Sequence, residues 1–110
     1  MLNKLQDTLQ DIKAEQVIAI DVQALTNITD YIVICTGRSK RHAAAIADHV
    51  KQSIKDYTDI KPVIQGLESS EWVIVDLQDI VLHIMLNEIR DFYQLEKLWD
   101  KELIISDKQY

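Results

Sequence analysis

Hydrophobic residues follow two different periods along the chain, and these periods predict alternating helices and strands. Near the N-terminus, apolar residues recur at spacings of three and four, as on one face of a short helix: Leu2, Leu5, Leu9 and Ile12. Residues 16–22 and 31–36 are instead apolar runs rich in β-branched side chains, which is typical of strands. The stretch between them contains Asn and Asp, which favour turns.

The second helical pattern begins after a glycine turn, where Ser39 is placed to cap a helix. Its apolar positions return at helical spacing: Ala43, Ile46, Ala47, Val50, Ile54 and Tyr57. A short strand at residues 59–66 follows, and Pro62 suits an edge strand or a strand start. Residues 72–77 and 80–86 read as two more strands, and the short Gln78-Asp79 link predicts an antiparallel hairpin.

After the hairpin, Asn87 is expected to cap a last helix with an apolar stripe of Ile89, Phe92, Leu95 and Leu98. The predicted order is α-β-β-α-β-β-β-α. It indicates a single α/β domain, with a mixed five-stranded sheet and helices packed against it. We expect this domain to span residues 1–100 and residues 101–110 to form a loose C-terminal tail.

The hairpin strands have two distinct faces, because side chains alternate along a strand. Trp72, Ile74 and Asp76 share one face of the first strand. In the second strand, the set that resembles core is Ile80, Leu82, Ile84 and Leu86, which leaves His83 on the other face with Val81 and Met85. If Trp72 lies beside His83, the surface combines a large aromatic with polar groups, as interaction sites do. The same residues allow Trp72 to be an ordinary core side chain.

Charge and cysteine content narrow the classes of partner and compartment. The net charge of −6 argues against binding DNA or RNA by charge alone, and it fits a basic protein partner better. The single cysteine, Cys35, cannot form an internal disulfide, which is compatible with a reducing compartment. The first residues lack the apolar core of a signal peptide, and apolar runs of about six residues are too short to span a membrane. We therefore expect a cytoplasmic protein.

The turn "TGRSKRH" at residues 36–42 raises the possibility of a phosphate site and an enzyme. Nucleotidyltransferases hold metal ions with two carboxylates, usually on alternate residues of one strand face. Here Val81 and His83 occupy the alternate positions after Asp79, so the second carboxylate is missing. The turn also lacks the spacing of a P-loop. The sequence predicts no metal and no cofactor, and a nucleotidyltransferase-like enzyme with atypical metal ligands remains the alternative.

Cations cluster at the start of the second predicted helix, where Lys40 and Arg41 oppose the helix dipole. Such a placement is either a secondary contact with a partner or a tolerated solvated face.

Three segments together resemble the ribosomal silencing factor family, also called Iojap-like. They are "TDYIVICTGRSKRHAAAIADHV", "EWVIVDLQDIVLHIML" and "RDFYQLEKLW". They are similar to the family's T-D-Y-F-V-I-C-S-G-x-S-x-R-Q, E-W-V-L-L-D-Y-G-D-V-V-V-H-V-F and R-x-F-Y-x-L-E-x-L-W. The resemblance covers about residue 5 to residue 100 in the right order. Two departures are His42 in place of Gln, and Leu77-Gln78 in place of Tyr-Gly.

The resemblance implies a nucleotidyltransferase-like core without catalytic carboxylates and a function that is not enzymatic. It implies a translational repressor that binds the large ribosomal subunit through ribosomal protein L-fourteen. The bound repressor would block joining of the small subunit when nutrients are short. The family also takes part in late large-subunit assembly in organelles. A third hypothesis is a homodimer that forms through the same surface when the protein is free.

The resemblance also implies which residues contact the partner. Trp72 matches the family's partner-facing tryptophan, and His83 matches its strand histidine. Glu71, Asp76 and Asp79 match acidic positions that could meet Lys or Arg. Three further matching positions, Tyr31, Arg90 and Tyr93, could be structural.

Overall fold

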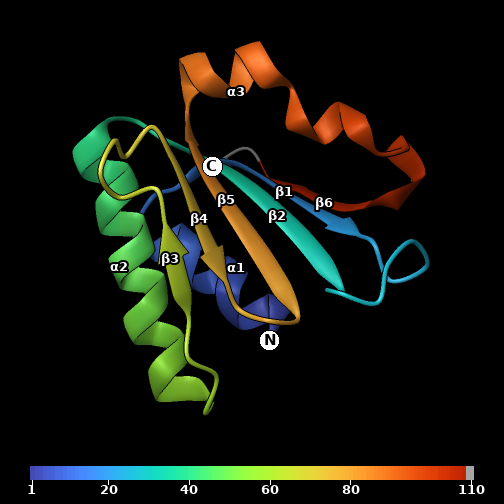
Figure 1. The fold of residues 1–110 in the computed structure, drawn as a ribbon, viewed down its shortest axis with the longest axis horizontal. Helices are drawn as coiled ribbons and strands as arrows, with labels where there is room; N and C mark the ends of the chain where they lie inside the picture. Colours follow the sequence, from blue (N-terminus) through green and yellow to red (C-terminus); the bar gives the residue numbers. More distant parts are fainter. Residues whose placement is uncertain (109–110) are drawn as a thin grey trace.

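A mixed six-stranded sheet forms the centre of the computed structural model, which describes the backbone of residues 1–108 and the side chains of residues 1–105 (Figure 1). The strands lie in the order β3-β4-β5-β2-β1-β6. The central β2 and β5 are parallel, and the other neighbouring strands are antiparallel. Their bounds are β1 Glu15–Asp21, β2 Tyr31–Gly37, β3 Val63–Gln65, β4 Trp72–Asp76, β5 Ile80–Leu86 and β6 Ile104–Lys108.

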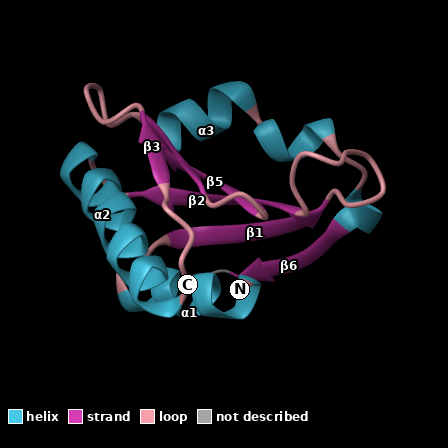
Figure 2. Cartoon of the chain, turned by 60° about the horizontal axis from the view of Figure 1, so that its bottom comes forward, coloured by secondary structure: helices cyan, strands magenta, loops and turns pink. Residues whose placement is uncertain are grey.

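Helices cover both faces of this sheet, so the molecule has three layers (Figure 2). Helices α1 (Leu2–Asp11) and α2 (Lys40–Tyr57) pack on one face and enclose the larger apolar core. Helix α3 (Asn87–Tyr93) and the 3-10 turns η1 (Leu95–Leu98) and η2 (Lys101–Leu103) lie over the other face, around a smaller core. The expected α/β class and packed helices are confirmed.

Local sequence signals explain how the first half of the sheet meets α2. The Ser39 hydroxyl accepts a hydrogen bond from the backbone N–H of His42 at 3.0 Å, which confirms the predicted cap. A Cβ atom added to Gly37 would lie 3.1 Å from Ala43, so two small residues let the helix approach the strand closely. The predicted apolar stripe of α2 is buried, except that Tyr57 is exposed.

The C-terminal predictions need correction. Residues 101–108 do not form a loose tail, because η2 leads into β6, which pairs with β1 and raises the strand count from five to six. The last helix ends at Tyr93, since Gln94 adopts a left-handed conformation with φ 48°. Its N-cap residue is Leu86, and the Asn87 side chain is not the cap. Phe92 is 79% exposed and Leu98 is 72% exposed, so neither belongs to the buried stripe that was predicted.

Candidate functional site

Four aromatic rings form a continuous row from the sheet to the solvent side of α3. Trp72 Nε1 donates a hydrogen bond to His83 Nδ1 at 3.0 Å, with the ring centroids 5.9 Å apart. The centroid of the Tyr93 ring lies 4.9 Å from that of the Trp72 ring. The Phe92 ring lies edge-on to the Tyr93 ring, with their centroids 5.0 Å apart. We call His83, Trp72, Tyr93 and Phe92 the aromatic row. Such tilted and edge-on arrangements are the favoured geometries of aromatic pairs.

Strand pairing explains why Trp72 and His83 meet. In the β4–β5 hairpin, Trp72 pairs with Met85 and Ile74 pairs with His83, so these side chains share the face away from α1 and α2. Trp72 is neither a fully buried core residue nor a fully exposed one, and its role in binding a partner stays a prediction. The ring is partly buried against the smaller core, yet it belongs to a surface that continues into exposed aromatic groups. Val73, Val75, Leu82 and Ile84 fill the opposite face, as the alternation predicted.

His83 is a neutral hydrogen-bond acceptor within the row. Desolvation by burial lowers the pKa of His83 from 6.5 to about 4, so the ring is uncharged near neutral pH. In the neutral ring Nδ1 can accept from Trp72 only when Nε2 carries the proton. His83 therefore holds the indole in place and supplies no positive charge to a partner.

Helix α3 is held over the sheet by a buried arginine. Arg90 is 4% exposed, and its guanidinium donates to the Gln16 carbonyl at 2.6 Å and to the Thr36 hydroxyl at 2.9 Å. Gln16 lies at an irregularity of β1 with φ 48°, where its carbonyl leaves the strand ladder. Glu96 of η1 lies 3.8 Å from Arg90 Nε. These contacts indicate that Arg90 positions the segment that carries Phe92 and Tyr93.

Carboxylates lie near both ends of the aromatic row. Helix α3 has Glu88 and Asp91 on its surface, while its one cation, Arg90, is buried. Glu71 precedes Trp72 and forms an exposed ion pair with Lys40 at 3.7 Å. The candidate secondary contact at Lys40 is therefore adjacent to the hairpin. Such an acidic, aromatic surface complements a basic protein surface with an apolar pocket.

The structure separates two of the predicted acidic contacts from Trp72. Asp76 lies at the far end of β4, about 13 Å from Trp72 at the usual rise of a strand. Its carboxylate accepts a hydrogen bond from the Gln78 backbone N–H at 2.9 Å, and the Asp79 carbonyl accepts from Asp30 and Tyr31. Both residues help to shape the hairpin turn. Trp72, His83, Glu71 and Lys40 lie together, and Asp76 and Asp79 lie apart from them.

The glycine turn before α2 has little capacity for phosphate. The Arg38 N–H donates to His42 Nδ1 at 2.9 Å, and the His42 N–H donates to Ser39 Oγ at 3.0 Å. His42 Nε2 lies 2.8 Å from the Ile12 carbonyl, so the ring joins this turn to the end of α1. These bonds engage backbone donors that a phosphate would need. Arg41 remains exposed on the first turn of α2.

Other features that could support an enzyme are also unfavourable. Among the described residues, no group of three His, Cys, Asp or Glu side chains is arranged to hold a metal ion. Burial raises the pKa of the Cys35 thiol to about 12, which makes it a poor nucleophile.

None of the helices in the described part of the chain is long and apolar enough to cross a membrane.

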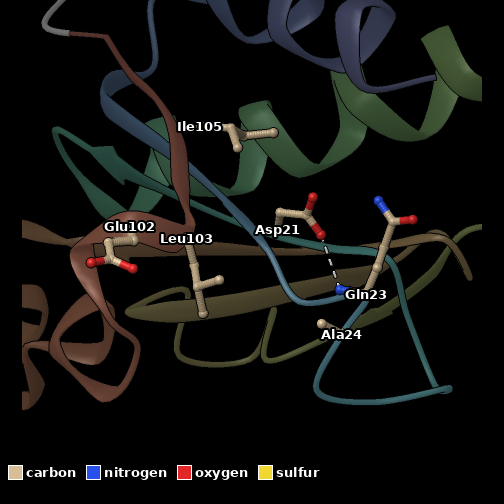
Figure 3. A pocket seen from close by; sticks show the side chains of 6 residues that line it. All are labelled: Asp21, Gln23, Ala24, Glu102, Leu103 and Ile105. Atoms are coloured by element: carbon tan, nitrogen blue, oxygen red, sulfur yellow. Dashed lines mark hydrogen bonds between the residues drawn. The ribbon is translucent and has the colours of Figure 1, made fainter.

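A surface cavity of about 260 Å³ lies at the opposite edge of the sheet, near η2 and β6 (Figure 3). Its lining residues are Asp21, Gln23, Ala24, Glu102, Leu103 and Ile105. The Asp21 carboxylate accepts a hydrogen bond of 3.0 Å from the Gln23 backbone N–H, which is the dashed line in Figure 3. The Asp21 carboxylate therefore stabilises the turn after β1. The cavity is separate from the aromatic row.

Comparison with known proteins decides the family. Residues 1–109 match the family model described as "Ribosomal silencing factor during starvation". The chain belongs to the ribosomal silencing factor family. Members named ribosomal silencing factor RsfS include a protein of Zymomonas mobilis, which is 36% identical over 90% of this chain and 74% of its own length. The family resemblance read from the three motifs is thus confirmed, and members carry the names of regulators, not of enzymes.

The structural and organellar relatives agree with this family. A crystal structure of a Chromobacterium violaceum protein matches with a TM-score of 0.84 and 36% identity, covering 89% of this chain and 82% of that chain. A mouse relative, named mitochondrial assembly of ribosomal large subunit protein 1, is 34% identical over 89% of this chain and 44% of its own length. The family and its named members together indicate a regulatory protein with a ribosomal partner.

Phe92 is the part of this surface that the sequence interpretation missed, because its spacing from Ile89 suggested a common buried stripe. A signal was available in the adjacent Tyr93. Consecutive side chains on a helix point about 100° apart, so two adjacent aromatic residues widen the apolar face, and one of them is expected at its solvent edge.

Proposed function

We propose that the protein is a cytoplasmic translational repressor that binds the large ribosomal subunit through ribosomal protein L-fourteen. The bound protein sterically blocks joining of the small subunit when nutrients are limiting. Membership of the ribosomal silencing factor family carries this proposal. The aromatic row and its acidic surroundings support it, because they suit a basic partner surface with an apolar pocket.

The proposed contact centres on the start of the β4–β5 hairpin. Trp72 and His83 form the aromatic part, and Glu71 supplies a carboxylate at the rim. Asp76 and Asp79 contribute at the far end of the hairpin if the partner surface extends along β4. Lys40, which pairs with Glu71, provides a secondary contact together with Arg41, the next residue of α2.

Subunit association measured by light scattering tests the blocking step. Purified large and small subunits are mixed with and without a saturating amount of the protein, and we expect it to suppress the signal of the joined ribosome. Unchanged association at saturation would refute the proposed function.

A matched pair of charge reversals tests the contact surface. Glu71→Lys reverses the charge beside Trp72. Asp48→Lys makes the same reversal at an exposed position of α2, which covers the opposite face of the sheet. We expect Glu71→Lys to weaken large-subunit binding and Asp48→Lys to leave it nearly unchanged. Equal effects would mean that overall charge, not this surface, governs binding.

Cross-linking tests the identity of the partner. A photoreactive amino acid in place of Gln65, exposed on the edge strand beside β4, should label ribosomal protein L-fourteen when the protein is bound to large subunits. Labelling of a different ribosomal protein alone would overturn that assignment.

The free protein is also proposed to form a homodimer through the aromatic row. Two copies that pair by this surface would cover exposed aromatic area, and they would then compete with ribosome binding. Light scattering of the free protein should give the mass of a dimer, and added L-fourteen should replace it with a one-to-one complex.

A further inference from the structure

Phe92 is the most exposed large side chain of the aromatic row. It is 79% exposed, against 54% for Tyr93, and Trp72 is partly buried. The indole N–H of Trp72 already donates a hydrogen bond within the protein, and the tilted Tyr93 ring packs against its ring. Phe92 therefore offers more apolar area to a partner than Trp72 does.

The rings beneath Phe92 give it a rigid support. Phe92 contacts Tyr93 edge-on with an interplanar angle of 79°, and Tyr93 lies against Trp72, which His83 holds by a hydrogen bond. Helix α3 is itself tied to the sheet by the buried Arg90. The backbone that carries Phe92 is thus fixed before binding, and an aromatic side chain has few rotatable bonds to immobilise, which favours affinity.

The carboxylates next to Phe92 favour a basic protein surface as the partner. Asp91 precedes it on α3, and Glu88 lies one helical turn earlier, both exposed. Arg90 does not offset them on the surface, because its guanidinium is buried and bonded to the sheet. An exposed apolar ring beside two carboxylates fits an apolar pocket bordered by Lys or Arg on a protein.

We propose that Phe92 is the hydrophobic anchor of the interface and inserts into such a pocket on the large ribosomal subunit. Tyr93, Trp72 and His83 act as positioning residues behind it. This inference rests on the proposed function and moves the main contact from the hairpin to α3. Truncation of an anchor of this kind is expected to weaken binding about 30-fold or more.

The test measures binding of the full chain to purified large ribosomal subunits. Phe92→Ala should weaken binding about 30-fold, and Phe92→Leu should recover part of the loss because it keeps apolar volume. Ile28→Ala is the matched control, since Ile28 is 87% exposed in the loop between β1 and β2, away from α3 (Figure 1). We expect that control to bind within about twofold of the original chain. Circular dichroism should show all three variants folded, because both positions are exposed.

The outcomes separate this inference from the proposed function. If Phe92→Ala binds as tightly as the original chain, and that chain blocks subunit joining, the anchor assignment is wrong and the proposed function stands. If Phe92→Ala and Ile28→Ala weaken binding equally, the anchor assignment is also wrong. If the original chain does not bind large subunits, both the proposed function and the anchor assignment are wrong. Selective loss with Phe92→Ala and partial recovery with Phe92→Leu support the anchor.

Discussion

Replacement of Arg90 by methionine tests whether one buried guanidinium holds α3 on the sheet. Arg90 donates to the Gln16 carbonyl and the Thr36 hydroxyl, and it lies 3.8 Å from Glu96. Arg90→Met keeps most of the aliphatic stem but leaves these acceptors without their donor. Each hydrogen bond from a charged donor contributes about 1.5–3 kcal/mol, and the lost desolvation cost of the guanidinium offsets part of this. We expect a net loss of about 3 kcal/mol in the free energy of unfolding.

Urea unfolding followed by circular dichroism measures this loss. A decrease of about 3 kcal/mol is a large share of the stability of a domain this size, and it corresponds to a fall in Tm of about 12 °C. Arg41→Met is the control, because Arg41 is exposed on α2 and its replacement should change stability by less than about 0.5 kcal/mol. A loss below about 1 kcal/mol for Arg90→Met would refute the structural role. We also expect Arg90→Met to weaken large-subunit binding, since it loosens the helix that carries Phe92.

Three further predictions concern the hairpin and its rim. Gln78 has φ 70°, so Gln78→Gly should raise the free energy of unfolding by up to about 1 kcal/mol, and a lower thermal midpoint would contradict this. Because the folded pKa of His83, about 4, lies below its ordinary 6.5, the folded protein binds fewer protons between these values. Stability should therefore fall as the pH drops from about 6.5 to 4, and His83→Asn, which keeps an acceptor for Trp72, should flatten this dependence in pH-dependent melts. Glu71→Ala breaks only an exposed ion pair with Lys40, so stability should change by less than about 0.5 kcal/mol; a larger change would reveal a structural role.

The motifs at the start of α2 show how a local signal can be read correctly and still mislead about function. Gly37 and Ser39 form the strand-to-helix turn and the cap that the sequence predicted. The same residues have the outline of a phosphate loop. The hydrogen bond from the Arg38 N–H to the His42 ring argues against that interpretation, and it depends on a side-chain orientation that spacing does not specify.

The spacing of hydrophobic residues determined most of the helices and strands, because it depends only on the local chain. Alternation along each strand grouped Trp72 with Ile74, and His83 with Met85, because side chains on a strand must alternate whatever surrounds them. The register of the β4–β5 pair then decided that the two groups share one face. The three motifs also determined the family. Residues 101–108 held only the short apolar run Leu103 to Ile105, which was too short to predict a strand by itself, and β6 is defined by its pairing with β1.

Tertiary structure alone decided how the surface is assembled. The motif suggested a structural role for Arg90 but not its partners, because the acceptors that bind its buried guanidinium lie 74 and 54 positions away in the chain. That contact fixes α3 in a direction that leaves Phe92 in solvent and places Tyr93 on Trp72. A period specifies which side chains share a face of one element. The packing of distant elements specifies which of those faces meets water, and so which residue is free to meet a partner.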